Sequence, residues 1–393
     1  MSIRKISSQY FLLCIGIVSL CLFSPGRSIA ESSSLTDFYI HQALDRYFVL
    51  PVDASTVAMS GSSGPSCRSS SCIYLNPAGL GEIQDPELSS TLGFSIISGE
   101  ELLSEQQLEQ SEYHGYLSAA FPLGPSVDGK PKYGTLDIAY SRYDGHTDDS
   151  VHTTPDGHRR SIAYGLSVFD QLNVGYAFHF YDDQLHNEVS DLHSHSRLLH
   201  IWGLQYQPLD ELKLSGLFKL GIGQSDTEDF RFESNGLSHL RSYSGVLGVS
   251  GDIGEVVASA AFDYTRVQTR GDLGAGQVAI PAVIGGSEQG NLYSIRAGVE
   301  REFVGGVSIR GGAQWQEVES YKFERMDLAP LSGSVTGFGV SLGAGYAIRP
   351  RPDAKPTIIL DYGFEYLLIG DGAFQHLVTV TIPFADDSAE GAS

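Results

Sequence analysis

The sequence predicts an all-β fold, a transmembrane antiparallel β-barrel of about fourteen strands with an N-terminal periplasmic plug. From residue 87 to residue 384, apolar residues alternate with small or polar ones, as in strands that have one apolar face. After residue 30 there is no run of eighteen apolar residues, the length expected of a membrane-spanning helix. Short and long connections alternate between successive strands, an asymmetry that soluble β-sandwiches and β-propellers do not normally keep.

Residues 1–30 have the pattern of a signal peptide. Arg4 and Lys5 form a positive start, residues 11–23 are apolar, and Ser28-Ile29-Ala30 matches a small-residue cleavage site. The alternative is an uncleaved anchor, but the apolar run is short of the roughly 20 residues that span a bilayer. Removing the leader takes away Arg4, Lys5 and Arg27 and no acid, so the formal net charge changes from -22 to -25. So acidic a chain is a poor candidate for binding nucleic acid or an anionic surface.

Residues 31–86 are expected to form the hatch, or plug, of the barrel. Between Asp53 and Leu80 the chain is rich in Gly, Pro and Ser, which bury too little apolar surface for a core helix. Asn76-Pro77-Ala78-Gly79 then specifies a rigid turn, because Pro fixes φ and Gly permits positive φ. Cys67 and Cys72 are expected to form a small disulfide loop in an exported protein, with free thiols or a metal pair as alternatives.

Residues 87–384 are expected to form the barrel, followed by a periplasmic tail at 385–393. The fourteen predicted strands are 88–96, 113–121, 133–143, 161–168, 172–181, 197–206, 212–223, 241–250, 256–266, 292–303, 307–316, 336–348, 357–366 and 375–384. The long, mostly acidic connections are 144–157, 182–196, 224–239, 267–291 and 317–335. Transmembrane barrels have such long loops on one rim and short turns on the other.

Charged residues of the predicted strands fall on the face assigned to the lumen. They are Asp137, Lys213, Lys219, Arg296, Glu300, Arg310, Asp361 and Glu365. On the lipid face each would cost about 2 to 4 kcal/mol near the midplane. They are interpreted either as a structural polar network or as part of a ligand path, with pairing to one another or to the hatch.

Two motifs point to chemistry that the rest of the pattern does not support. Gly339-Val340-Ser341-Leu342-Gly343 matches the nucleophile elbow, but it lies inside an alternating strand with no helix after it. Its glycines are better explained by a lumen face left open for the plug, so we expect no enzyme and no cofactor. His186, His193, His195 and His200 lie in and beside one loop with Asp182, Asp183 and Asp191. A solvated loop is expected there rather than a metal site.

The hatch resembles that of the FadL family of outer-membrane channels, in which a small-residue run, often with a step like Ala58-Met59, leads into an Asn-Pro-Ala turn. The last segment, His376 to Phe384, resembles the terminal strand of bacterial outer-membrane proteins, although Pro383 and nine following residues depart from the usual form. The resemblance implies a channel in the bacterial outer membrane for long-chain fatty acids or other hydrophobic compounds, released through the barrel wall after the hatch rearranges. Asn76, Pro77 and Ala78 then fall on the hatch turn.

The implied partners are a hydrophobic small molecule, outer-membrane lipid and the barrel-assembly machinery, and no nucleic acid. The alternative is a barrel of the same superfamily that acts as a secretion-system shuttle or anchor, an interaction protein. Residues 278–284, the apolar run within a loop, are compatible with either function.

Overall fold

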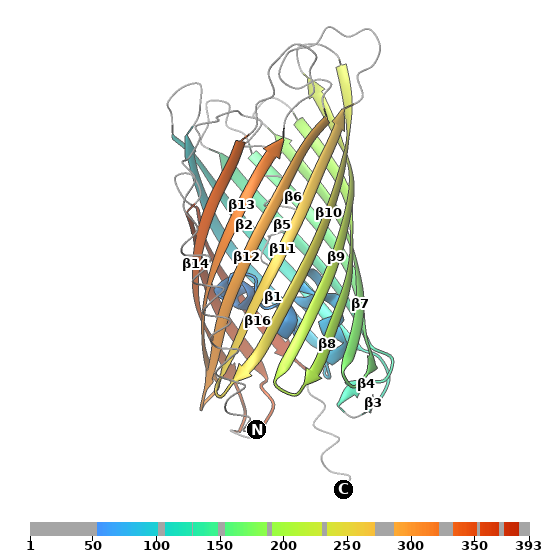
Figure 1. Ribbon diagram of the computed structural model, residues 1–393, viewed down its shortest axis with the longest axis vertical. Coiled ribbons are helices and arrows are strands. Elements are labelled where there is room, and N and C mark those ends of the chain that lie inside the picture. Colours follow the sequence, from blue (N-terminus) through green and yellow to red (C-terminus); the bar gives the residue numbers. More distant parts are fainter. Residues whose placement is uncertain are drawn as a thin grey trace.

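Fourteen strands form one closed antiparallel barrel, which confirms the predicted fold class (Figure 1). The computed structural model describes residues 53–100, 107–127, 129–147, 154–186, 191–229, 234–271, 287–321, 333–351, 354–368 and 373–384. The predicted signal peptide, the first part of the hatch, the apolar loop run at 278–284 and the C-terminal tail lie outside these residues. Among the described residues, no helix has the length and apolarity needed to cross a membrane.

Each barrel strand pairs with its neighbours along the chain, and β1 pairs with β16 to close the ring. The barrel strands are β1 (Glu87–Glu100), β2 (Gln107–Pro122), β5 (Thr135–Thr147), β6 (Thr154–Phe169), β7 (Leu172–His186), β8 (Asp191–Leu209), β9 (Leu212–Asp229), β10 (Ser234–Ile253), β11 (Val256–Gly271), β12 (Ser287–Phe303), β13 (Val307–Tyr321), β14 (Gly333–Ile348), β15 (Ile358–Leu368) and β16 (Ala373–Pro383). A small separate hairpin joins β3 (Ser126–Val127) and β4 (Lys130–Pro131) between β2 and β5.

All fourteen predicted strands are present, but most are longer at one end than the sequence pattern predicted. Much of the predicted long connections is strand: β9 continues to Asp229 and β10 begins at Ser234, inside the predicted 224–239 loop. The cause is that ladder hydrogen bonds join backbone groups, so a strand can continue beyond its stretch of apolar alternation. We call the end with the long connections the long-loop rim and the opposite end the short-turn rim.

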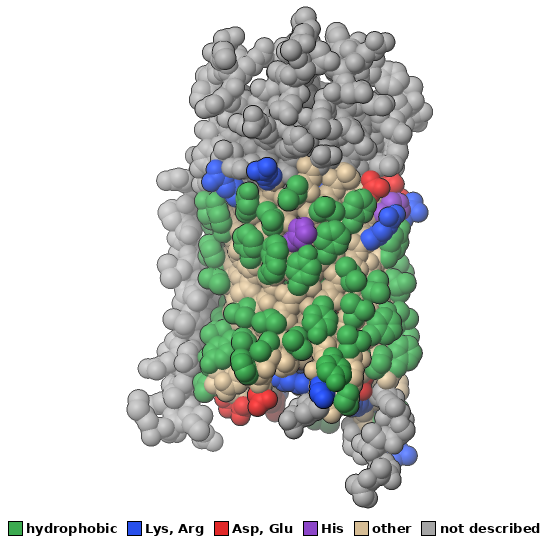
Figure 2. Space-filling view, turned by 90° about the vertical axis from the view of Figure 1, so that its right-hand side faces the viewer, with side chains coloured by type: hydrophobic (Ala, Val, Ile, Leu, Met, Phe, Trp, Pro, Cys, Tyr) green, Lys and Arg blue, Asp and Glu red, His purple; other side chains and the backbone are tan. Residues whose placement is uncertain are grey.

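The alternation places large apolar side chains outside and small or polar ones inside. In β1, Leu92 is 71% exposed on the outer surface, whereas Ser89 and Thr91 are buried in the lumen. The outer surface carries a broad band of hydrophobic side chains with charged ones gathered along its edges (Figure 2). This is the outer surface that a bilayer requires, and closure of the barrel leaves no open sheet edge in hydrocarbon.

The described part of the hatch, residues 53–86, lies inside the barrel nearer the short-turn rim (Figure 1). It folds into four short helices: α3 (Ala54–Ala58), η1 (Gly64–Ser66), α4 (Cys72–Leu75) and η2 (Pro77–Glu82). Asp53 caps α3 by accepting a 2.7 Å hydrogen bond from the Thr56 amide. These short helices have too little apolar surface to be stable alone, so contacts with the barrel wall hold the hatch in place.

The last barrel strand, β16, ends at a proline. Pro383 is the final residue of β16, so its missing N–H interrupts no interior ladder bond. The Phe384 amide then donates a 2.7 Å hydrogen bond to the Pro86 carbonyl, which joins the end of the last strand to the segment before β1.

Candidate functional site

The hatch turn is fastened to the barrel wall at Asn76. This residue has extended backbone, and its Oδ1 accepts a 3.2 Å hydrogen bond from the Ala78 amide at the start of η2. Its Nδ2 donates a 3.2 Å bond to the Leu204 carbonyl of β8. Asn76 thus caps the hatch helix and binds the wall at the same time, and Pro77 occupies the first helical position, where no N–H is needed.

Three adjacent glycines of the wall receive this turn, and we call them the glycine seat: Gly165 of β6, Gly175 of β7 and Gly203 of β8. Gly165 pairs with Gly175, and Gly175 pairs with Gly203. A Cβ at Gly175 would lie 2.2 Å from the Pro77 carbonyl carbon, and one at Gly203 would lie 2.2 Å from the Asn76 Oδ1. Hatch backbone therefore packs directly on wall backbone, where no side chain fits.

A second contact joins the start of the hatch to the opposite part of the wall. A Cβ at Gly343 would lie 2.3 Å from the Ala58 Cβ. The buried Ser341 Oγ donates a 2.9 Å hydrogen bond to the Ala58 carbonyl and lies 2.8 Å from the Ser60 Oγ. The nucleophile-elbow match is thus a strand segment on the lumen face that binds the hatch.

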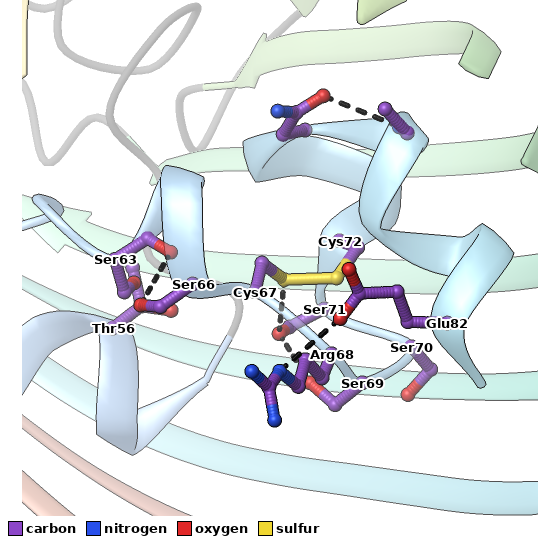
Figure 3. The surroundings of a disulfide bond; sticks show 12 residues. Thr56, Ser63, Ser66, Cys67, Arg68, Ser69, Ser70, Ser71, Cys72 and Glu82 are labelled. Atoms are coloured by element: carbon purple, nitrogen blue, oxygen red, sulfur yellow. Dashed lines mark hydrogen bonds and ion pairs between the residues drawn. A yellow bond between two sulfur atoms is a disulfide. The ribbon is translucent and has the colours of Figure 1, made fainter. Parts of the chain in front are cut away.

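Cys67 and Cys72 are joined by a disulfide between η1 and α4, with Cα atoms 5.6 Å apart (Figure 3). A Cβ at Gly79 would lie 2.5 Å from the Cys67 carbonyl oxygen and 2.8 Å from the Cys72 Sγ. Gly79 has no positive φ, so the conformational reason expected for this glycine is wrong. Its lack of a side chain instead lets η2 pack on the disulfide loop.

Glu82, at the end of η2, anchors the hatch to the wall electrostatically. Its carboxylate accepts hydrogen bonds of 2.8 and 2.7 Å from the Lys213 Nζ of β9 and one of 3.1 Å from Asn173 of β7. Arg68 of the disulfide loop lies 3.2 Å from the same carboxylate (Figure 3). One carboxylate thus joins two segments of the hatch to two strands of the barrel.

A cavity of about 70 Å³ lies between the hatch and the wall. Hatch residues from α3, η1 and α4 form one side of it. The apolar part of the wall is formed by Leu199, Ile201 and Leu217, with Tyr181 and Val246 beside them. The polar part of the lining is the set Arg159, Ser215, Lys219, Asp263, Arg296, Gln314, Glu365 and Gln375. The cavity is therefore apolar on one side and charged on the other.

Among the described lining residues, three side chains are cationic and two are carboxylates. Arg296 lies 3.7 Å from Asp263, and Glu365 accepts hydrogen bonds from Gln314 (2.9 Å) and Gln375 (2.6 Å). The Lys219 ammonium interacts electrostatically with Asp263 and Arg296. This side of the cavity therefore presents more positive than negative charge.

Arg159 is held between two aromatic rings at the boundary of the cavity. Its guanidinium lies 4.7 Å from the Tyr74 ring centroid and 4.3 Å from that of Tyr181, within the range of cation–π attraction. The Tyr74 hydroxyl is 2.7 Å from the Ser161 Oγ, and burial raises the pKa of this phenol above its ordinary value. The neutral Tyr74 ring therefore links α4 of the hatch to β6 and β7.

The eight predicted lumen charges face inward, but they form separate groups rather than one network. Arg310 binds Glu300 at 2.8 Å and also Asp361, whereas Lys213 binds the hatch residue Glu82. Lys219, Arg296 and Glu365 line the cavity. Asp137 is fully buried, and no described residue hydrogen-bonds to its side chain.

Sequence reasoning did not single out Asp263 or Arg159. Asp263 lies on the inward phase of β11, between the outward-facing Phe262 and Tyr264, so the alternation contained the signal. Arg159 was missed because the predicted strand began at Ser161, whereas β6 begins at Thr154.

The His and Asp residues assigned to one loop lie in β7 and β8, so the loop assignment was wrong. Asp182 and His200 face the outer surface, and His200 Nδ1 lies 2.7 Å from the Tyr176 hydroxyl. The other side chains of the cluster lie outside the described set. Within that set, no group of three or more His, Cys, Asp or Glu residues is placed to hold a metal ion.

No protein-family model matches the chain, and no curated protein matches it either. Solved structures do match over almost their whole length. A Pseudomonas aeruginosa FadL homologue has a TM-score of 0.60 at 11% identity, covering 86% of this chain and 99% of its own. The Ralstonia pickettii toluene transporter TbuX has a TM-score of 0.56 at 12% identity, and the match covers 86% of this chain and 100% of the transporter. The monoaromatic hydrocarbon channel CymD has a TM-score of 0.53 at 14% identity, and the match covers 86% of this chain and 99% of that channel.

The chain has the FadL-like channel fold. At such low identity the likeness concerns the fold alone, and it covers 86% of this chain in each of the three structures. The FadL-like fold thus agrees with the resemblance that the hatch turn indicated.

Proposed function

We propose that this protein is a channel of the bacterial outer membrane through which hydrophobic compounds diffuse under control of the hatch. Residues 1–30 would direct export, and the barrel-assembly machinery would insert the barrel among outer-membrane lipids. The proposal is supported by the FadL-like fold and by three neighbours described as a FadL homologue, a toluene transporter and a monoaromatic hydrocarbon channel.

The observation that carries the proposal is the cavity between the hatch and the wall. Its volume of about 70 Å³ is less than half that of an apolar cavity of about 150 Å³ that holds benzene. A substrate of this class therefore does not fit in this cavity until the hatch moves. The glycine seat and the Glu82–Lys213 pair are contacts that such a movement would break.

The lining favours a substrate with an apolar body and one anionic group, and a long-chain fatty acid has this form. Leu199, Ile201 and Leu217 offer apolar surface, while Lys219 and Arg296 offer charged donors near the opposite side. A carboxylate gains from such donors because charge-assisted hydrogen bonds are roughly twice as strong as neutral ones. A monoaromatic hydrocarbon would gain from the apolar side only.

Uptake of two labelled solutes tests the proposal and its substrate class. Cells that lack their own fatty-acid importer would express the wild-type protein, Lys219→Gln or Arg301→Gln, and accumulation of oleate and of toluene would be measured. The proposal expects uptake of oleate by the wild type and a roughly tenfold loss in Lys219→Gln, because a hydrogen bond to a charged group is worth about 1.5 kcal/mol.

The control Arg301→Gln removes an exposed cation at the short-turn rim, away from the cavity lining, and should leave oleate uptake unchanged. Toluene uptake should not depend on Lys219. If toluene and oleate were taken up equally in every variant, the preference for an anion would be contradicted. If a correctly inserted wild type took up neither solute, the transport function would be contradicted.

A further inference from the structure

Arg296 of β12 has buried hydrogen-bond donors that the protein itself does not use. The residue is 9% exposed and lines the cavity between the hatch and the wall. Among the described residues, none accepts a hydrogen bond from its Nε or its Nη2. The N–H groups of these two atoms form one edge of the guanidinium and point the same way, so they converge on a single anionic acceptor. Buried donors of this kind are costly to leave without an acceptor, which indicates a bound group.

The two carboxylates of the cavity lining are bound to other groups. Asp263 lies 3.7 Å from the Arg296 Nη2, which is an ion-pair distance but too long for a hydrogen bond. Its Oδ1 accepts hydrogen bonds of 3.0 Å from the Ser244 hydroxyl and 3.2 Å from the Thr265 hydroxyl. Both oxygens of Glu365 accept hydrogen bonds from glutamine amides, at 2.9 and 2.6 Å. Neither carboxylate therefore satisfies the free edge of the guanidinium.

The charges of the cavity lining do not balance. Three cations, Arg159, Lys219 and Arg296, stand against the carboxylates of Asp263 and Glu365, so the lining residues carry a net charge of +1. Lys219 interacts electrostatically with Arg296, a like charge, as well as with Asp263. Uncompensated charge in a water-poor interior is costly. A water molecule would satisfy the Arg296 donors and leave this charge, whereas a monovalent anion would do both.

The hatch closes this site and limits its size. A Cβ at Gly61 would lie 2.9 Å from the Arg296 Nη1, so hatch backbone lies directly against the guanidinium. Gly61 also has a φ of 71°, which favours glycine there for a second reason. The cavity of about 70 Å³ is larger than the roughly 10 to 15 Å³ that one water-sized occupant needs, and a chloride ion is only slightly larger than water. A small anion therefore fits while the hatch is docked.

We infer that this cavity binds a small monovalent inorganic anion of the size of chloride, which accepts hydrogen bonds from the Nε and Nη2 of Arg296. Lys219 supplies further positive charge to the anion. The anion lies between the hatch and the wall, so it binds only the docked state and stabilises that state by mass action. Its binding does not depend on transport, whereas its displacement by a substrate carboxylate as the hatch opens rests on the proposed function.

A chloride titration of the purified mature protein in neutral detergent tests the inference. The rate at which a protease cleaves the hatch would be measured as chloride replaces gluconate, an anion too large for the cavity, at constant ionic strength. Cleavage requires the hatch to leave the wall, so the rate in the wild type should fall as chloride rises. Crystals grown in bromide should show an anomalous-scattering peak beside Arg296, which locates the anion directly.

Three variants give the titration its controls. A hydrogen bond to a charged group contributes about tenfold to binding, so Arg296→Gln should raise the chloride concentration for half-maximal protection by at least about tenfold. Arg301→Gln removes an exposed cation from the same strand and should behave like the wild type. Asp263→Asn makes the lining more positive and should lower that concentration. Heat-modifiable migration on a gel would show that every variant is a folded barrel.

Cleavage of the wild type that does not depend on chloride would overturn the inference, as would the absence of bromide beside Arg296, which would indicate water there. An equal loss of protection in Arg301→Gln would also overturn it, because the effect would then be one of general charge. Halide binding and solute uptake are separate readouts. A wild type that binds bromide but imports no oleate contradicts only the channel function, and one that imports oleate without binding halide contradicts only the anion site.

Discussion

Lys213 of β9 donates hydrogen bonds of 2.8 and 2.7 Å to the carboxylate of Glu82, which lies at the end of the last hatch helix. Both side chains are largely buried, so removing the Glu82 carboxylate leaves the Lys213 ammonium without its partner, at a cost of about 3 to 5 kcal/mol. The barrel ladder does not depend on this pair. Losing the pair should therefore weaken docking of the hatch on the wall rather than folding of the barrel. In this sense the pair anchors a movable segment.

We expect Glu82→Gln to loosen the hatch without unfolding the barrel. Single-channel conductance of the purified protein in planar bilayers would be low and quiet for the wild type and higher, with frequent openings, for the variant. Glu255→Gln, which removes a carboxylate paired with Arg301 in solvent, is the matched control and should conduct like the wild type. Equal conductance in Glu82→Gln and the wild type would contradict the anchor.

The glycine seat predicts a similar effect from steric crowding. Gly175→Ala places a methyl group 2.2 Å from the Pro77 carbonyl carbon, so the hatch turn must shift away from β7. Gly245→Ala, on the outer surface, meets no atom within 4 Å and serves as the control. Limited proteolysis should cleave the hatch faster in Gly175→Ala than in Gly245→Ala, and equal rates would argue against the seat.

The disulfide is expected to be formed in the mature protein and to stabilise the hatch loop. Closing a loop of this length restricts the unfolded hatch by about 2 kcal/mol in the chain-entropy model. Mass spectrometry after alkylation without reduction should find neither Cys67 nor Cys72 labelled. Two alkylated thiols in exported, folded protein would refute the prediction, and Cys67→Ser with Cys72→Ser should leave barrel formation intact.

The orientation of the outer surface predicts a depth-dependent cost for a buried charge. Leu342 is 65% exposed and lies 6 residues from the end of β14 at Ile348, close to the expected midplane, whereas Tyr346 lies only 2 residues from that end. Leu342→Arg should lower the free energy of unfolding in lipid vesicles by about 2 to 4 kcal/mol and Tyr346→Arg by at most about 1. Equal costs at the two depths would be inconsistent with a bilayer around this surface.

The fourteen strands and the inward orientation of the charged side chains were predictable, because both follow from the alternation of residue types within a strand. The partners of those charges were not, since they depend on strand tilt and on the position of the hatch. Lys213 was assigned to the lumen, yet its partner Glu82 lies 131 residues earlier in the chain. The role of Gly175 was equally hidden, because only the register with Gly165 and Gly203 brings three glycines together under the hatch turn.

Accumulation of a labelled long-chain fatty acid in cells without their own importer tests the central claim most directly. The comparison is between the wild type and a triple variant, Asn76→Gly, Pro77→Ser and Ala78→Gly, which keeps the barrel but replaces the rigid hatch turn. The account predicts uptake by the wild type and a clearly altered rate in the variant, with equal amounts of folded barrel in the outer membrane. Wild-type protein that inserts but restores no uptake, or a variant whose rate equals that of an active wild type, would contradict it.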